Sequence, residues 1–323
     1  MVKKEIIKII NDAIKMNASD IHFTLNEDES IMIQFRAGNI MLPRGKIDRD
    51  LYEKILGFIR FHSAMDLSHP LQPQSGSLII QEKEDTISCR VSILPTTRFR
   101  SLVLRVINVK NGKSLDEIPL FNPNIALLKE IAQFQAGLIL IGGPTSSGKT
   151  TTAYAMIDYL KNELSKSIIT IEDPIEYQHH DIVQMQVNES AGMSYEIGIK
   201  EILRHDPDVI VIGEIRDKVT AANAIRAALT GHLVISTIHS KDNLGTIHRL
   251  MDLEVSLTEI NQAVTALINQ RLVPSGVEKK ALFEICYGND LENIMEQVIE
   301  GNVIVVPYTT LDEEFLKWRQ QQK

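Results

Sequence analysis

The sequence has little cysteine: only Cys89 and Cys286 occur among 323 residues. Two thiols are too few for a disulfide framework or for a zinc site of four thiolates, so a reducing compartment fits and no structural zinc is expected. The chain also lacks any apolar run near the roughly 20 residues that a membrane-spanning helix needs. Its N-terminal isoleucines are interrupted by charged residues, which does not suit a signal peptide. We therefore expect a cytoplasmic protein.

An excess of positive charge is also missing. The chain has 34 Lys and Arg against 42 Asp and Glu, a formal net charge of −8. This balance disfavours a broad surface for nucleic acid, although it leaves a narrow basic channel open. There is no low-complexity tract and no excess of glycine or proline, so the chain is expected to fold throughout. Its length predicts two domains.

Residues 1–110 have the pattern of a mixed α/β domain. Period-two alternation and β-branched residues predict strands, and helical spacing predicts a helix at the N-terminus and another over 49–63. Residues 111–124 contain Gly112, Pro119 and Pro123 and break every period, which predicts an interdomain linker. The predicted strands of this domain are 30–36, 77–81, 86–94 and 101–107.

Residues 125–323 have a different pattern, in which short, wholly apolar runs alternate with helical segments. Such runs are typical of a mostly parallel sheet covered by helices on both faces. The sequence therefore predicts an α/β fold with repeated βα units. The predicted strands are 138–143, 167–173, 208–214 and 233–239, and the predicted helices are 150–164, 195–204, 219–229, 257–272, 291–301 and 311–322.

A phosphate-binding motif, G-x-x-x-x-G-K-T, follows the first of these apolar strands and opens a helix, which is the context that the motif requires. Its glycines allow the backbone N–H groups to form a concavity at a helix N-terminus. Lys149 would neutralise the β- and γ-phosphates of ATP, and the Thr150 hydroxyl would bind Mg²⁺. The expected nucleotide-binding residues are Gly143, Pro144, Thr145, Ser146, Ser147, Gly148, Lys149, Thr150 and Thr151. Kinases, helicases, GTPases and transporters share such a loop, so the loop alone does not select a function.

Acidic residues follow two other predicted strands. Glu214 ends VIVIGE, where Gly213 stands at the position at which an aspartate is usual, and it would act on Mg²⁺ through water or orient the attacking water. Glu176 lies on a turn after SIITIED, at the sheet edge where ligands of α/β folds bind. Glu176 is the first candidate for general base and Glu214 the second, and a solvated acidic turn is the alternative for Glu176.

Histidines bracket the next strand, LVIST. His232 precedes it and His239 follows it. A histidine at a strand end can donate to a γ-phosphate and so sense hydrolysis, although a single histidine is more often only a structural hydrogen-bonding group. Two of them around one strand favour a function.

Taken in order, GPTSSGKT, TIEDPIEY, DPDVIVIGEIRD and TGHLVISTIHS resemble the motifs of the secretion ATPases that power type II secretion, type IV pili and competence pseudopili. The resemblance implies a RecA-like P-loop ATPase domain, a smaller PAS-like N-terminal domain, a homohexameric ring, and ATP with Mg²⁺. RVSILP and LVLRVI are similar to the family's arginine-bearing strands. By this resemblance, Arg90 and Arg105 would reach the triphosphate across the domain cleft.

The sequence departs from the larger family members between INQRLVP and ALFEI, where a four-cysteine zinc module is replaced by residues 275–280. The chain is thus most similar to the short, zinc-free competence members. This resemblance implies a motor on the cytoplasmic face of the membrane, docked on a polytopic platform protein, that assembles pseudopilins for DNA uptake without touching DNA itself. A retraction motor, a ring translocase that grips nucleic acid, and a non-hydrolysing regulator are the alternatives.

Overall fold

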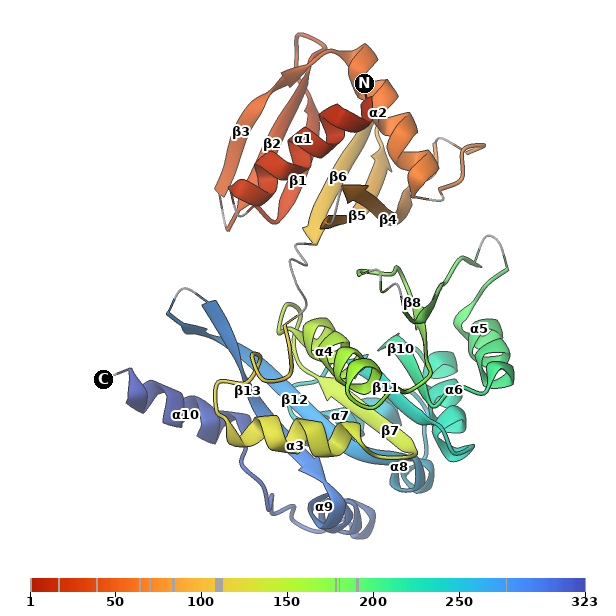
Figure 1. Cartoon of the computed structure of the whole chain (residues 1–323), viewed down its shortest axis with the longest axis vertical. Coiled ribbons are helices and arrows are strands. Elements are labelled where there is room, and N and C mark those ends of the chain that lie inside the picture. Colours follow the sequence, from red (N-terminus) through yellow and green to blue (C-terminus); the bar gives the residue numbers. More distant parts are fainter. Residues whose placement is uncertain are drawn as a thin grey trace. The chain divides into compact units, whose positions relative to one another are not determined.

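The computed structural model describes residues 2–16, 18–38, 40–63, 65–69, 71–82, 85–107, 113–177, 179, 181–189, 192–276 and 278–322. Its contacts divide the chain into two compact units. The first contains residues 1–111 and the short segment 174–178, and the second contains residues 112–173 and 179–323. Figure 1 shows the elements of both units.

The N-terminal unit is an antiparallel six-stranded sheet, with strand order β3-β2-β1-β6-β5-β4, and two helices. In β2, alternate residues Ile31, Ile33 and Phe35 are buried, as expected of a sheet with one face in the core. Apolar residues of both helices, among them Ile10 and Ile55, pack in the same core. The elements are α1 (Val2–Lys15), β1 (Asp20–Leu25), β2 (Ile31–Ala37), β3 (Ile40–Ile47), α2 (Arg49–His62), β4 (Gln74–Glu82), β5 (Asp85–Pro95) and β6 (Arg100–Ile107).

The second unit has a seven-stranded sheet with the order β13-β12-β7-β11-β10-β8-β9. Neighbouring strands are parallel except for β12 and β13, so the predicted mostly parallel sheet is confirmed. The strands are β7 (Gly137–Gly142), β8 (Ile168–Glu172), β9 (Val183–Gln186), β10 (Val209–Ile215), β11 (Leu233–Ile238), β12 (Val264–Ser275) and β13 (Glu278–Tyr287). The helices are α3 (Pro123–Ala132), α4 (Lys149–Asn162), α5 (Tyr195–Ile202), α6 (Lys218–Leu229), α7 (Asn243–Asp252), α8 (Leu257–Ala263), α9 (Gly288–Glu300) and α10 (Leu311–Gln321), with a 3₁₀ turn at Leu203–His205.

Helices cover both faces of this sheet, which explains why its central strand β7 is buried at every position. Along β7, Leu138 and Leu140 belong to one hydrophobic cluster, whereas Ile139 and Ile141 belong to another. The first cluster includes side chains of α5, α6, α7, α8 and α9, and the second includes side chains of α3 and α4. Because successive strand residues point to opposite faces, a strand between two cores needs an apolar residue at every position.

The predicted helix over 257–272 is wrong in its second half. A capping box at Ser256 starts α8, but the helix ends at Ala263 and the chain continues as β12. This strand pairs with β7 on one side and β13 on the other, and these ladders outweigh the helical spacing of its apolar residues. The elements β1, β3, β9, α3 and α7 were not predicted from the sequence.

The predicted linker covers residues 111–124. Its first two residues, 111 and 112, lie outside the described residues. Further on, Leu115 and Ile118 are buried in the core of the second unit, and α3 starts at Pro123. Pro123 is therefore a helix-starting residue, a position at which the missing N–H of proline costs nothing.

A buried carboxylate joins the C-terminal elements of this unit. Glu284 of β13 is 4% exposed, and it accepts hydrogen bonds from the amides of Asn243 (2.7 Å) and Leu311 (3.1 Å), the first residues of α7 and α10. Burial raises the pKa of Glu284, and these two amide bonds oppose the rise.

Glu284→Ala is expected to lower the free energy of unfolding by about 2–4 kcal/mol, because it leaves two buried amides without an acceptor. Urea denaturation of the purified chain measures the change. Glu278→Ala, on an exposed residue of the same strand, is the matched control and should cost less than about 1 kcal/mol. Equal losses in the two variants would show that Glu284 does not hold the helices.

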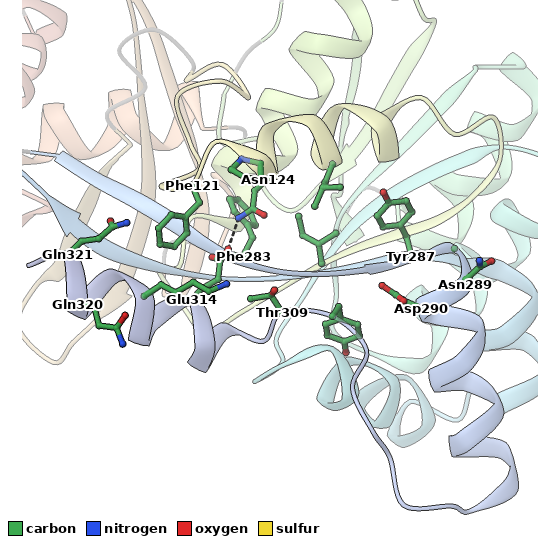
Figure 2. A pocket seen from close by; sticks show the side chains of 16 residues that line it. Phe121, Asn124, Phe283, Tyr287, Asn289, Asp290, Thr309, Glu314, Gln320 and Gln321 are labelled. Atoms are coloured by element: carbon green, nitrogen blue, oxygen red, sulfur yellow. Dashed lines mark hydrogen bonds between the residues drawn. The ribbon is translucent and has the colours of Figure 1, made fainter.

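A cavity of about 1010 Å³ lies beside these elements, between α3, β13 and α10 (Figure 2). Glu314 is buried at its edge, and both carboxylate oxygens are already engaged, by the Asn124 side-chain amide at 2.8 Å and the Phe283 amide at 2.7 Å. None of the residues that line the cavity belongs to the phosphate-binding motif. This cavity is therefore separate from the site predicted from the sequence.

Among the described residues, no group of three or more His, Cys, Asp or Glu side chains is arranged to hold a metal ion. Both cysteines are buried and free. No helix within the described ranges is long and apolar enough to cross a membrane.

Candidate functional site

The phosphate-binding loop runs from the end of β7 to the first turn of α4, as the motif predicts. Gly148 caps the helix with a φ of +88°, a left-handed conformation that a side chain would strain. Pro144, Thr145 and Ser146 are exposed at the tip of the loop. The first amides of α4 have no carbonyl partner within the helix, so this helix end can bind an anion.

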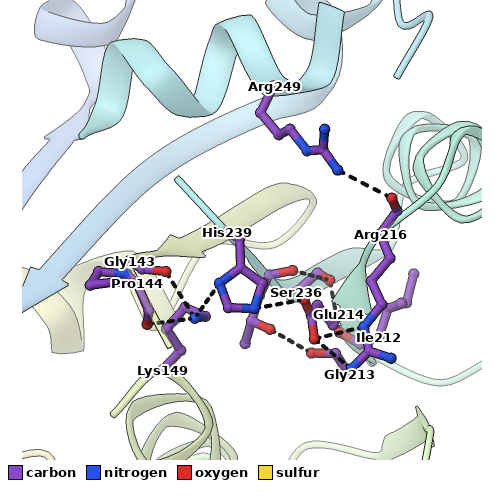
Figure 3. A network of polar contacts seen from close by, with 11 residues as sticks. Gly143, Pro144, Lys149, Ile212, Gly213, Glu214, Arg216, Ser236, His239 and Arg249 are labelled. Carbon is purple, nitrogen blue, oxygen red and sulfur yellow. Dashed lines mark hydrogen bonds and ion pairs between the residues drawn. The ribbon is translucent and has the colours of Figure 1, made fainter. Parts of the chain in front are cut away.

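Lys149 is the first residue of α4, directly after the loop, and is 8% exposed. Its Nζ donates to the carbonyl oxygens of Gly143 (2.9 Å) and Pro144 (3.1 Å) and lies 3.4 Å from Nδ1 of His239 (Figure 3). Burial lowers the pKa of Lys149, and the negative charge of Glu214 opposes this shift. The loop therefore holds a compact cation at the place where the motif predicts phosphate.

Glu214 reaches the same site from a β-bulge. The register between β10 and β11 shifts from Ile212 to Ile215, which frees the Gly213-Glu214 step from the regular ladder. Two hydroxyl groups of β11 hold this bulge, since Ser236 donates to the Ile212 carbonyl and Thr237 to the Gly213 carbonyl, each at 2.8 Å. The bulge turns the Glu214 side chain toward His239.

A chain of polar contacts then connects the loop to the end of β10. Nε2 of His239 lies 3.1 Å from one carboxylate oxygen of Glu214, and the Arg216 guanidinium contacts the other oxygen with two nitrogens at 2.9 Å (Figure 3). The hydrogen bond with Glu214 raises the pKa of Arg216. Arg249 of α7 in turn donates to the Arg216 carbonyl at 3.4 Å. Lys149, His239, Glu214 and Arg216 thus form one continuous network.

Ser236, Thr237 and Arg216 were not predicted from the sequence to belong to the site. For the two hydroxyl residues a signal was present: Ser-Thr interrupts an otherwise apolar strand, LVISTI, directly beside the strand that ends in Glu214. Arg216 had no such signal, because an arginine two residues after a strand is usually a surface residue.

His232 is not brought to this network. It precedes β11, at the amino end of the parallel strands, whereas the phosphate-binding loop and His239 follow the carboxyl ends of theirs. Its Nδ1 lies 3.2 Å from the Thr230 hydroxyl, and its carbonyl accepts from the Gly137 amide at 3.1 Å. These contacts are those of a structural residue that joins β11 to β7.

Three predicted site residues belong to the N-terminal unit. Glu176 lies in the segment 174–178, which groups with that unit. Arg90 on β5 and Arg105 on β6 are directly opposite each other in the antiparallel ladder. Nε of Arg105 donates to the buried Asp20 carboxylate at 2.9 Å, while most of the Arg105 side chain stays exposed. The two arginines therefore share one face of the N-terminal sheet.

Two acidic residues near the end of β8, Glu172 and Glu176, lie in different environments. Glu172, which ends the strand, is buried and accepts hydrogen bonds from the hydroxyls of Thr170 (2.7 Å) and Tyr154 and from the Gln184 amide (3.2 Å). A carboxylate held by three donors is fixed in place. Glu176 is partly exposed beyond it.

The residues of this site fit a nucleoside triphosphate with Mg²⁺. Positive charge comes from the N-terminus of α4 and from the buried ammonium group of Lys149. The backbone N–H groups of the glycine-containing loop are donors for phosphate oxygens. Oxygen ligands that Mg²⁺ prefers are available from the Thr150 hydroxyl and, through water, from Glu214. The hydroxyls of Ser147 and Thr152 in the same loop and helix are buried without a hydrogen-bond partner among the described residues.

The chain is similar to known proteins over most of its length. Residues 1–302 match the family model described as "Type II/IV secretion system protein". The chain is 37% identical to the competence protein ComGA of Bacillus subtilis, over 96% of this chain and 92% of that protein. It is 36% identical to type II secretion system protein E of Pseudomonas aeruginosa, over 83% of this chain but only 54% of that longer protein.

Among solved structures, the crystal structure of the pilus retraction motor PilT with bound ADP is similar, with a TM-score of 0.77 and 27% identity over 97% of this chain and 92% of that one. The resemblance predicted from the four motifs is confirmed by the family match and by the competence relative. This chain belongs to the type II/IV secretion system protein family.

Proposed function

We propose that this chain is the subunit of a hexameric ATPase motor that assembles a competence pseudopilus for DNA uptake. The observation that carries the proposal is the continuous network from Lys149 in the phosphate-binding loop through His239 to Glu214. It joins a buried lysine, a histidine and a carboxylate at the carboxyl edge of a parallel sheet, the edge at which α/β folds bind ligands. The similarity to ComGA over nearly the whole chain supports the competence role.

In this proposal, residues 143–151 hold the phosphates of ATP, and the second unit is a RecA-like domain. Mg²⁺, held by Thr150 and through water by Glu214, would neutralise charge on the phosphates when bound. Glu214 accepts the proton of the attacking water or orients it, and Glu176 is the alternative base. His239 contacts both Lys149 and Glu214, so a change at either residue reaches the other through its ring.

The N-terminal unit, proposed to be PAS-like, supplies Arg90 and Arg105 to a triphosphate in the ring. Arginine suits this role because its planar guanidinium binds phosphate with two parallel hydrogen bonds. Motion of this unit against the ATPase domain would transmit ATP turnover to a polytopic platform protein at the cytoplasmic face of the membrane. Pseudopilins are then acted on only through the platform.

Pilus retraction is the second candidate function, because the structural similarity to PilT extends over nearly the whole of both chains. The two motors have opposite effects on fibres. An assembly motor adds pilin subunits, whereas a retraction motor removes them.

Deletion of the gene in its own host separates these functions. We expect cells without surface pseudopili and without transformation by added DNA, with both restored by a plasmid copy. Immunoblots of sheared fibres and counts of transformants measure the result. Excess fibres in the deletion strain would reject assembly and establish retraction. Normal fibres with lost transformation would reject both pilus functions and favour direct action on DNA.

A further inference from the structure

A buried glutamine on β12 contacts the phosphate-binding loop. Gln270 is 0% exposed and lies in INQRLVP, a segment that the proposed function does not use. Strand β12 runs parallel to β7, with Asn269 opposite Gly142. Gln270 therefore lies level with Gly143, where the loop leaves the sheet.

The amide of Gln270 binds one particular peptide group of the loop. Its Nε2 donates to the Ser147 carbonyl at 2.7 Å. In a trans peptide the C=O of one residue and the N–H of the next point in opposite directions. Because Gln270 holds the Ser147 carbonyl, the Gly148 N–H is directed away from Gln270. Gly148 is the last residue before the helix, so this N–H belongs to the donors available for phosphate.

The packing around this contact leaves the loop little freedom. A Cβ atom on Gly143 would lie 2.7 Å from the Gln270 carbonyl oxygen, and one on Gly148 would lie 3.1 Å from Nε2 of Gln270. Both glycines of the motif thus face the same residue. Their lack of side chains lets β12 approach the loop closely enough for the hydrogen bond to form.

The contact also has a cost for the folded chain. Within the described part of the chain, Oε1 of Gln270 and the Ser147 hydroxyl are buried without hydrogen-bond partners. Buried polar groups without partners are rare because they lose their hydration. An apolar side chain of similar size would avoid this penalty at position 270, which indicates that the amide serves the loop rather than the stability of the core.

We propose that Gln270 is a positioning residue that sets the orientation of the Ser147–Gly148 peptide for phosphate binding. This inference rests on the proposed function, in which the loop binds ATP. Gln270 touches no nucleotide atom in this role. Gln270 acts on a backbone amide that contacts phosphate both before and during hydrolysis. Substitution of Gln270 should therefore weaken nucleotide binding more than it slows turnover.

The test uses Gln270→Met, which keeps the length of the side chain but cannot donate, and Gln270→Asn, which keeps the amide but is one methylene shorter. We expect both variants to bind a fluorescent ATP analogue about tenfold more weakly, the equivalent of one hydrogen bond. KM for ATP should rise by a similar factor, with kcat within about threefold of wild type. Gln270→Glu should bind more weakly still, because its carboxylate faces the Ser147 carbonyl.

The control is Ile268→Val, a core change on the same strand at the position opposite Ile141 of β7. It should lower the melting temperature of the nucleotide-free protein without changing nucleotide affinity. A folded Gln270→Met or Gln270→Asn variant that binds the analogue within twofold of wild type would overturn the inference. Normal ATP hydrolysis and binding by Lys149→Ala would instead overturn the proposed function, so the two failures are distinguishable.

Discussion

Lys149→Ala is expected to lower ATP hydrolysis by about 100- to 1,000-fold, the effect of removing one preorganised group that stabilises transition-state charge. Lys149 is the buried cation of the loop, and its Nζ lies within hydrogen-bonding reach of both loop carbonyls and His239. Alanine leaves the phosphate charge unopposed and disconnects the loop from Glu214. Phosphate release by the purified protein measures the loss.

The matched control is Lys161→Ala, which removes a lysine from the last turn of the same helix. Its hydrolysis rate should stay within twofold of wild type, because that turn lies about three helical turns from the loop. A hydrolysis rate in Lys149→Ala close to that of the control would mean that ATP is not hydrolysed at this loop.

Glu214→Gln is expected to lower kcat by about 100- to 10,000-fold, the range for removal of a general base, while nucleotide affinity stays near wild type. The amide has the shape of the carboxylate but cannot take a proton. The contacts of this side chain with His239 and Arg216 lose the negative charge of the carboxylate. Single-turnover hydrolysis separates the chemical step from binding.

Glu176→Gln, measured in the same way, decides between the two candidate bases. Glu214 is joined to Lys149 through His239, whereas Glu176 belongs to a segment that groups with the N-terminal unit. We therefore expect the larger loss of kcat in Glu214→Gln. A larger loss in Glu176→Gln would assign the base to Glu176 and leave Glu214 its role toward Mg²⁺. Glu201→Gln on α5, where Glu201 pairs only with a neighbouring arginine among the contacts described, is the inert control.

The central site could be predicted from the sequence because its chemistry is local. The loop is encoded by one continuous segment, Gly143–Thr150. The apolar strand β7 directly precedes this segment, and helix α4 begins within it. Glu214 and His239 could be predicted as well, since each directly follows or ends an apolar strand. Parallel strands bring their carboxyl ends to one edge, so local motifs at strand ends meet in space.

The contacts that hold the site could not be predicted, because they join distant residues. Gln270 and Ser147 are 123 residues apart, and their hydrogen bond depends on β12 lying beside β7. The apolar spacing over 257–272 suits a helix, and only the two neighbouring strands make 264–275 a strand. His232 flanks the same strand as His239, but it lies at the amino end of that strand, away from the network, and its predicted role stays a prediction.

The mixed α/β class of the N-terminal unit was predicted from the sequence, but two of its strands were not. Alternation revealed β2, β4, β5 and β6, yet β1 and β3 were missed. In β3 no residue is buried, so it has no apolar face for a pattern to show. A strand of this kind is recognisable only from its partner, β2.

The central claim, that hydrolysis at this site powers fibre assembly, is tested most directly in cells that carry Glu214→Gln in place of the wild-type gene. The variant protein should accumulate normally and bind ATP, and sheared-fibre immunoblots should show no pseudopili. Wild-type amounts of fibre in these cells, with the purified variant inactive in hydrolysis, would contradict the account.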